Sequence, residues 1–146
     1  MPRGTLMSER VSIVAADGRG RREVLGIALS STGPPFRIEV TRRSGSSGYE
    51  GNAYFICLAK LQRDMYEEGL LLCCQGSRPD ITSSSMLKAS GGREMYVFDP
   101  GTRELTGELV DIFAPAPYEA VATPDEQRAA FFTFSGLKDR GWRMPR

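Results

Sequence analysis

The sequence contains no histidine among its 146 residues. This absence removes histidine general bases, the Ser-His-Asp and Cys-His nucleophile pairs, and the commonest zinc ligand. Phosphate-cradling glycine motifs are also missing, because Asp17-Gly18-Arg19-Gly20 lacks both the spacing and the following helix. We therefore expect no cofactor, no metal site and no catalytic residues, and the protein is not expected to be an enzyme.

Cysteine is scarce as well. Cys57, Cys73 and Cys74 are an odd number, and all three lie in apolar runs, where a reduced cysteine behaves as a small hydrophobic residue. A disulfide framework would need a different pattern and an oxidising compartment, and two adjacent cysteines cannot supply the separated ligand pairs of a structural zinc site. These residues predict a reduced, cytoplasmic protein.

Long hydrophobic runs are absent too. No apolar stretch approaches the roughly 20 residues that span a bilayer, and Met1 to Arg10 lacks the apolar core of a secretory signal. No membrane partner is therefore expected. The length suits one domain, which we place at residues 9–146, and residues 1–8 are expected to form a disordered extension.

Neither sign of charge dominates the chain. Nineteen basic and 18 acidic residues leave a formal charge of +1, and Glu23, Glu39 and Glu50 dilute the arginines between residues 19 and 43. Proteins that bind nucleic acid usually carry a concentrated basic surface, so no nucleic-acid partner is expected. Only three of the basic residues are lysines. A surface rich in arginine suits the binding of a partner, because each guanidinium group is planar and carries several hydrogen-bond donors.

Alternating apolar residues predict that strands open the chain, near residues 11–16, 25–29 and 36–42. Residues 43–51 are rich in serine and glycine and are expected to form a mobile loop. A helix is expected over residues 52–68, since Asn52 can cap it and Gly69 can end it. Its predicted core-facing residues are Tyr54, Leu58, Leu61 and Met65.

The following apolar run, residues 70–75, is too short for a helix and is predicted to be a central strand. Residues 76–92 then form a long polar loop, and loops of this length are often functional. Strands are expected at residues 95–98 and 108–113. A Thr123 cap, followed by Pro124 and Glu126, predicts a helix over residues 124–135. The expected fold is a single α+β domain, with a mainly antiparallel sheet of about six strands packed with two helices.

Three carboxylates keep a catalytic alternative open. Asp99, Glu108 and Asp111 lie in or beside predicted strands, and they could serve a small enzyme or a ligand-binding domain. Asp111 lies in an apolar run and so needs a partner or an exposed face. Pairing with an arginine is the ordinary explanation for such a residue.

Short motifs between residues 49 and 113 resemble a family of small bacterial proteins encoded beside polymorphic toxins of the Rhs and type VI secretion kind. The resemblance implies an immunity protein, which binds and neutralises a cognate toxin by occluding its active site. The residues that carry it are Tyr49-Glu50-Gly51-Asn52, the run from Gly69 to Arg78, Ser85-Met86, Gly91-Gly92-Arg93, Tyr96 and the run from Leu109 to Phe113.

On this interpretation the partner is the cognate toxin domain. Arg78 and Arg93 are expected to contact its carboxylates, and Met86 is expected to fill an apolar pocket. The neutral charge suits a toxin with a protein or nucleotide substrate, for instance an ADP-ribosyltransferase. An enzyme that reverses the toxin's modification remains an alternative. The expected partner-binding residues are Tyr49, Glu50, Arg78, Asp80, Ser85, Met86 and Arg93.

Overall fold

Four antiparallel strands open the chain in the computed structural model, which describes residues 7–82 and 91–135. They follow one another through short turns, and each strand pairs with the next. The connection after the first strand is closed by Asp17, whose side-chain oxygen accepts the Arg19 backbone N–H at 2.7 Å. The strands are β1 (Met7–Ala16), β2 (Arg22–Ser30), β3 (Phe36–Arg42) and β4 (Gly45–Gly51).

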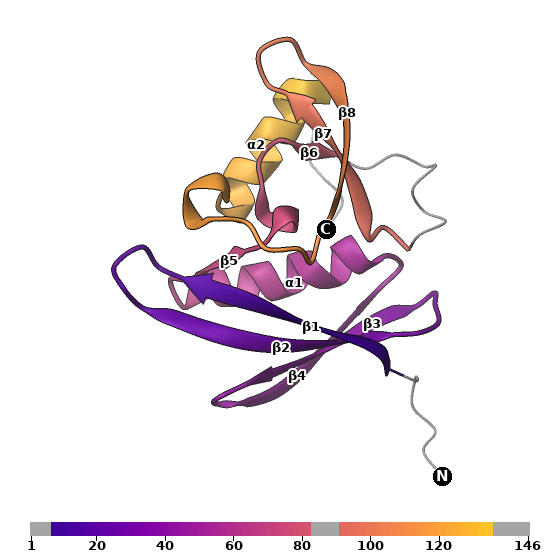
Figure 1. Ribbon diagram of the computed structural model, residues 1–146, viewed down its shortest axis with the longest axis vertical. Coiled ribbons are helices and arrows are strands. Elements are labelled where there is room, and N and C mark those ends of the chain that lie inside the picture. The colour runs from indigo at the N-terminus through magenta and orange to yellow at the C-terminus, as the bar shows by residue number, and fades with distance from the viewer. Residues whose placement is uncertain (1–6, 83–90, 136–146) are drawn as a thin grey trace, which may run out of the picture.

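The first sheet has the strand order β4-β3-β2-β1-β5, with β5 (Leu71–Cys73) at one edge. Helix α1 (Tyr54–Glu67) packs across one face of this sheet, and in Figure 1 it separates the sheet from the rest of the molecule. The apolar side chains on one face of the strands pack against the apolar stripe of α1 and form one core with it. Its fully buried members include Ile13, Leu25, Ile27, Ile38, Leu58, Leu61 and Met65.

A second, smaller sheet has the order β6-β7-β8 and is accompanied by helix α2. A separate small cluster of Ile81, Val97 and Val110 lies in this sheet, and Met95 packs against both this cluster and the main core. The elements are β6 (Ile81–Thr82), β7 (Glu94–Asp99), β8 (Glu104–Asp111) and α2 (Pro124–Ser135), with a 3-10 turn η3 (Tyr118–Ala120) before α2.

The turn η1 (Gln75–Ser77) connects the two sheets. Its Gly76 N–H donates to the Ile112 carbonyl at 2.9 Å, and its Ser77 hydroxyl accepts from Gln62 Nε2 at 2.7 Å. Gln62 belongs to α1 and Ile112 directly follows β8. Buried polar groups of this kind are stable only when they are paired, so the turn is held from both sides.

The α+β class, the single domain and the two predicted helices are confirmed. The Thr123 cap is also confirmed: Thr123 N–H donates to Glu126 Oε1 at 2.8 Å, and Glu126 N–H donates to Thr123 Oγ1 at 3.1 Å. Gly69 ends α1 with a φ of 81°, as predicted. No helix among the described residues is long and apolar enough to cross a membrane.

Four predictions of local structure were wrong. The described residues form two antiparallel sheets with eight strands instead of one sheet of about six. Residues 43–51 are not a loop, because most of them form β4. The strand predicted at residues 70–75 is shorter and lies at the edge of the sheet. Asn52 does not cap α1: the N-cap is Ala53, without a side-chain hydrogen bond, and Tyr54 N–H donates instead to the Gly91 carbonyl at 2.6 Å.

The two remaining boundaries differ in detail. Strand β1 begins at Met7, so residues 7 and 8, which were expected in a disordered extension, belong to a strand, and residues 1–6 lie outside the described residues. The polar segment 76–92 contains η1 and β6, which pair and hydrogen-bond with neighbouring elements. Residues 83–90 of that segment lie outside the described residues.

Candidate functional site

The residues predicted to bind a partner are distributed over both sheets. Tyr49 and Glu50 belong to β4, whereas Arg78 and Asp80 lie between η1 and β6, and Arg93 immediately precedes β7. Ser85 and Met86 lie outside the described residues. The prediction therefore involves three separate places in the described structure.

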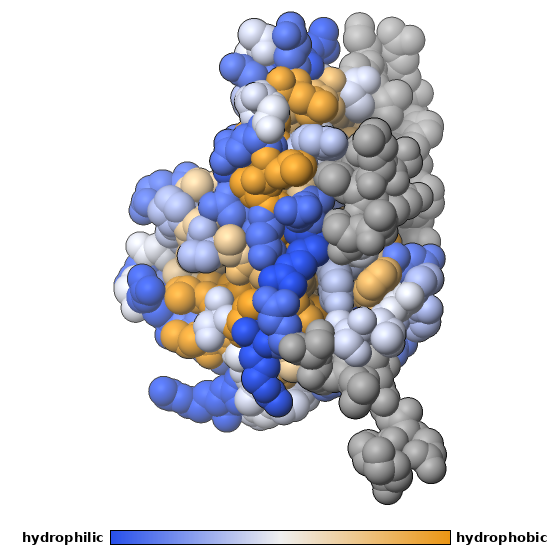
Figure 2. All heavy atoms as spheres, turned by 45° about the vertical axis from the view of Figure 1, so that its right-hand side comes forward, coloured by the Kyte–Doolittle hydropathy of each residue, from blue (hydrophilic) through white to orange (hydrophobic). Residues whose placement is uncertain are grey.

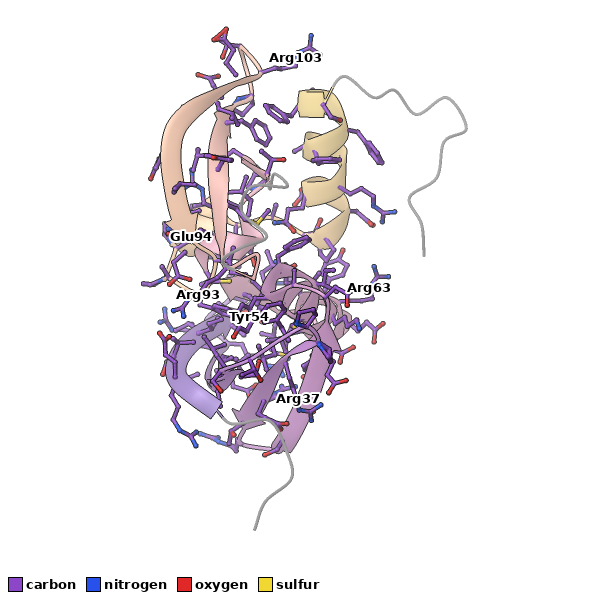
Figure 3. All side chains as sticks on the ribbon, turned by 90° about the vertical axis from the view of Figure 1, so that its right-hand side faces the viewer. Arg37, Tyr54, Arg63, Arg93, Glu94 and Arg103 are labelled. Atoms are coloured by element: carbon purple, nitrogen blue, oxygen red, sulfur yellow. The ribbon has the colours of Figure 1, made fainter. Side chains whose placement is uncertain are left out.

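Strand order keeps these places apart. Arg93 binds Glu9 of β1, and the register places Glu9 three strand spacings, or about 14 Å, from Tyr49 of β4. Figure 3 shows the same separation, since Arg37, which pairs with Glu50, lies far from Arg93. Of the five described residues, only Arg78 and Asp80 are joined to one another by a hydrogen bond.

Arg78 already has carboxylate and amide partners within the chain. Its Nε and Nη2 donate to the two carboxylate oxygens of Asp80 at 2.8 and 2.7 Å, and its Nη1 donates to Gln75 Oε1 at 2.8 Å. Hydrogen bonding to Asp80 raises the pKa of Arg78. A partner carboxylate would have to share or displace Asp80, so Arg78 is a positioned, locally neutralised group.

Arg93 likewise joins two carboxylates, and they belong to different sheets. Its guanidinium donates to Glu9 of β1 at 2.6 and 2.8 Å and to Asp111 of β8 at 3.0 Å, and it lies 5.8 Å from the Phe113 ring centroid. The hydrogen bond from Arg93 lowers the pKa of Glu9. Arg93 therefore fastens the first sheet to the second, and it supplies the arginine partner that was expected for Asp111.

Tyr49 and Glu50 are tied to neighbouring elements. The Tyr49 hydroxyl donates to Asp64 Oδ2 of α1 at 2.6 Å, and burial together with this bond raises the pKa of Tyr49 to about 12. The Glu50 carboxylate accepts from Arg37 Nη1 at 3.3 Å, and the Glu50 backbone carbonyl accepts from Lys60 Nζ at 2.6 Å. These contacts hold β4 against β3 and α1.

The carboxylates of the catalytic alternative do not converge. Asp99 pairs with Glu104 at one end of the β7–β8 hairpin, and Asp111 pairs with Glu94 at the other end, about 20 Å along the strand. Asp99 Oδ1 accepts the Gly101 N–H at 2.7 Å and so shapes the turn. Within residues 7–82 and 91–135, no group of three or more acidic or cysteine side chains could hold a metal ion.

Two leucines of β8 form an exposed apolar surface that the sequence did not predict. Leu105 and Leu109 are 50% and 45% exposed. They pair with Phe98 and Tyr96 of β7, which places all four side chains on the face that α2 partly covers, because directly opposite residues share a face. We call Tyr96, Leu105 and Leu109 the β8 surface. Figure 2 shows hydrophobic residues exposed in this part of the molecule.

Charged residues lie next to the β8 surface along the strand and at the hairpin tip. Glu104 and Glu108 are exposed on the same strand, and Arg78 lies near enough to Glu108 for an electrostatic interaction. At the tip of the hairpin, Arg103 Nη1 donates to the Thr133 carbonyl of α2 at 3.3 Å. An apolar centre with a charged border is the usual composition of a protein-binding surface.

A second arginine cluster, on the first sheet, holds two carboxylates whose pKa values it lowers. Arg42 is 16% exposed and donates to Glu23 of β2 at 2.8 and 2.9 Å and to Glu68, after α1, at 2.7 and 2.8 Å. Hydrogen bonding to Arg42 lowers the pKa of both carboxylates below the ordinary value of 4.5. Their contribution to stability is therefore present above pH 4.5 and is lost as the pH falls through the lowered values.

Replacing Arg42 by methionine is expected to flatten this acid dependence. At pH 7 the free energy of unfolding should fall by about 1 kcal/mol, a modest effect because Glu68 is partly exposed, and the difference from the wild type should shrink towards pH 2. Urea unfolding at pH 7, 4 and 2 measures both quantities. The matched control is Arg63→Met, which removes an equal charge from the exposed side of α1 (Figure 3). An equal, pH-independent loss in both variants would contradict the prediction.

Comparison with protein-family models and with curated proteins finds no match to this chain. The functional argument therefore depends on the chain's own surface. Among the described residues, that surface includes the exposed leucines of β8, while Arg78 and Arg93 are paired with carboxylates of the same chain.

Proposed function

We propose that this chain is an immunity protein that binds a cognate secreted bacterial toxin domain in the cytoplasm and occludes its active site. The observation that carries the proposal is the exposure of Leu105 and Leu109, side by side on one face of β8. A large apolar side chain that is half exposed has much of its surface free to be buried by another protein. The resemblance of residues 49–113 to immunity proteins supports the same conclusion.

The β8 surface supplies the apolar centre of the proposed contact. Fully burying a leucine contributes roughly 1.5–3 kcal/mol, and these two are already about half buried, so together they offer about 1.5–3 kcal/mol. Most binding energy in protein interfaces comes from a few such central residues. The bordering Glu104 and Glu108 are both acidic, so we expect the toxin to present basic groups around an apolar patch.

In this proposal Arg78 and Arg93 have a different role from the one that the sequence predicted. Arg93 fastens the two sheets, and Arg78 is held by Asp80 at the border of the second sheet. Arg78–Asp80 can contact the toxin as a neutral, preorganised pair. The overall charge of +1 favours a toxin that acts on a protein or a nucleotide, such as an ADP-ribosyltransferase, over one whose site holds a long phosphate chain.

Co-purification with the toxin domain encoded beside this gene tests the proposal. The wild-type protein should form a 1:1 complex and inhibit the toxin stoichiometrically. The double variant Leu105→Ser/Leu109→Ser should bind at least 30-fold more weakly, which corresponds to a loss of about 2 kcal/mol. The matched control is Val24→Ser, which changes another exposed apolar residue, 65% exposed on the first sheet, and should bind like the wild type.

Two results would contradict this function. If the double variant binds as tightly as the Val24→Ser control, the β8 surface is not the contact. If substoichiometric amounts of the protein restore modified substrate after the toxin has been removed, the protein is an enzyme that reverses the modification, and occlusion is wrong.

A further inference from the structure

The two sheets have four edge strands in the described part of the chain, and three of these edges are protected. β5 has only three residues and is followed by a bridge between Cys74 and Pro115. β6 has two residues. β8 has a register shift opposite β7, where Gly107 adopts a φ of 91° and Glu108 N–H donates to Thr106 Oγ1. Short strands, prolines and bulges all hinder pairing with another strand.

β4 is the exception. All seven of its residues pair with β3 in an unbroken register, from Gly51 opposite Phe36 to Gly45 opposite Arg42. The strand contains no lysine or proline, and five of its seven residues are exposed. No described strand lies on its other side, and Figure 1 shows β4 as the outermost strand of the first sheet.

The hydrogen bonds of β3 show which backbone groups of β4 point away from β3, towards the open edge. Arg37 N–H donates to Ser30 Oγ at 3.0 Å, on the side of β2, so Arg37 and its partner Glu50 are a non-hydrogen-bonded pair. Glu50 therefore directs its N–H and C=O away from β3, where its carbonyl accepts from Lys60. Because these directions alternate along a strand, Ser46 and Gly48 also present their N–H and C=O groups to the open edge.

We propose that β4 pairs antiparallel with β4 of a second copy of this chain, centred on Gly48, so that two five-stranded sheets become one sheet of ten strands. In this register Gly48 lies opposite Gly48 of the second copy, and Ser46 lies opposite Glu50 of the second copy. The outward-facing residues 46, 48 and 50 are symmetric about the centre. Each copy therefore offers its outward N–H and C=O groups to those of the other, as a two-fold axis requires, and the Glu50 carbonyl would accept the Ser46 N–H of the other copy beside or in place of Lys60.

Charge complementarity favours a second copy over an unrelated strand. The Arg37 guanidinium lies across Gly48, so closely that an added Cβ would overlap it, and it pairs there with Glu39 and Glu50. In the proposed register, Glu50 of one copy is the diagonal neighbour of Gly48 of the other, over which the second Arg37 lies. Each Arg37 then has a carboxylate in both copies, and no two like charges are directly opposite.

The contact between the copies is small. Two seven-residue strands bury less than the roughly 1,200 Å² of a standard stable interface, so we expect a weak dimer with a Kd on the order of 10⁻⁵ M. The purified protein should sediment as a monomer at about one tenth of that concentration and as a dimer at about ten times that concentration. Amide exchange at Ser46 and Gly48 should slow over the same range.

Ser46→Pro is the informative variant. Its missing N–H would face the open edge and not β3, so the fold should be retained while dimerisation weakens at least tenfold. Ser46→Thr keeps the N–H and should dimerise like the wild type. Should Ser46→Pro unfold, the dilution dependence of amide exchange in the wild type still decides the matter.

Three outcomes would overturn the proposal. The first is a protein that stays monomeric at all concentrations up to 1 mM, about a hundred times the expected Kd. The others are a dimer that Ser46→Pro does not weaken and in which the Ser46 amide exchanges freely, or slowed amide exchange on dimerisation that maps to β8. The last outcome would mean that the exposed leucines join two copies. The Leu105→Ser/Leu109→Ser variant should still dimerise through β4, so failure of this inference is distinguishable from failure of the proposed function.

Discussion

Replacing Phe98 by alanine is expected to destabilise the protein by about 3–5 kcal/mol. Phe98 is 2% exposed and stacks on Phe134 of α2, with 4.2 Å between the ring centroids. The variant leaves a cavity between the second sheet and α2 that the short strands around it cannot close. Urea unfolding followed by circular dichroism measures the loss in the free energy of unfolding.

The loss should be concentrated in α2. This helix has no fully buried residue. The hydrogen bonds that attach it include those from Gln127 Nε2 to the Gly76 and Arg78 carbonyls at 2.7 and 2.9 Å and from Arg103 Nη1 to the Thr133 carbonyl at 3.3 Å. Without the stacked rings, we expect α2 to detach while α1 and the first sheet remain folded. Hydrogen exchange should therefore accelerate over residues 124–135 more than over residues 54–67.

Phe134→Ala is the matched control for this prediction. It removes the same ring stack from a half-buried position, so it should release α2 at a smaller overall cost in stability than Phe98→Ala. A uniform acceleration of exchange across α1 and α2 in the Phe98→Ala protein would contradict the idea that α2 is a separately anchored element.

The elements that could be predicted are those whose sequence pattern lies within a few neighbouring residues. The Thr123 cap and the stripe of Leu58, Leu61 and Met65 depend on residues within one or two turns of a helix, and both are confirmed. The alternation in β3 likewise reports a strand with one buried face. Such patterns predicted the α+β class, but they cannot say how many sheets the strands form.

β4 could not be predicted because its stability comes from its neighbours. Of its seven residues, only Tyr49 packs against the core, and the rest are mainly glycine and serine, which carry no apolar alternation. Pairing with β3 and the bonds from Arg37 and Lys60 make this segment a strand. Strand formation depends on such tertiary context more than helix formation does.

The candidate site shows the same limit. Arg93 and Glu9 are 84 positions apart, so the sequence could not reveal that Arg93 is used inside the chain. Leu105 was missed because Gly107 interrupts the alternation, and the predicted strand began only at residue 108. The signal that could have found the β8 surface is the repeated Glu-Leu of Glu104-Leu105 and Glu108-Leu109, which places two leucines beside two exposed carboxylates.

Replacing Gly76 by alanine is expected to cost about 3 kcal/mol, although the change adds only one methyl group. A Cβ at this position would overlap Leu58 Cδ2 and would lie 2.9 Å from Ile112 Cβ and 3.0 Å from the Ile112 carbonyl oxygen. Side chains can move, but the carbonyl accepts the Gly76 N–H and is fixed by that bond. Overpacking against a fixed neighbour lies at the upper end of the usual 1–3 kcal/mol range. Urea unfolding measures the loss.

A double-mutant cycle tests the cause. Leu58→Ala alone should cost about 2–5 kcal/mol, but it opens space at the atom nearest to the added methyl group. In that background Gly76→Ala should therefore cost at least about 1 kcal/mol less, since residues in contact are not additive. The control is Gly26→Ala, where an added Cβ meets only ordinary contacts at 3.8 Å or more and should change stability by less than about 1 kcal/mol. If the cost of Gly76→Ala equals that of Gly26→Ala, close packing at η1 does not hold the two sheets together.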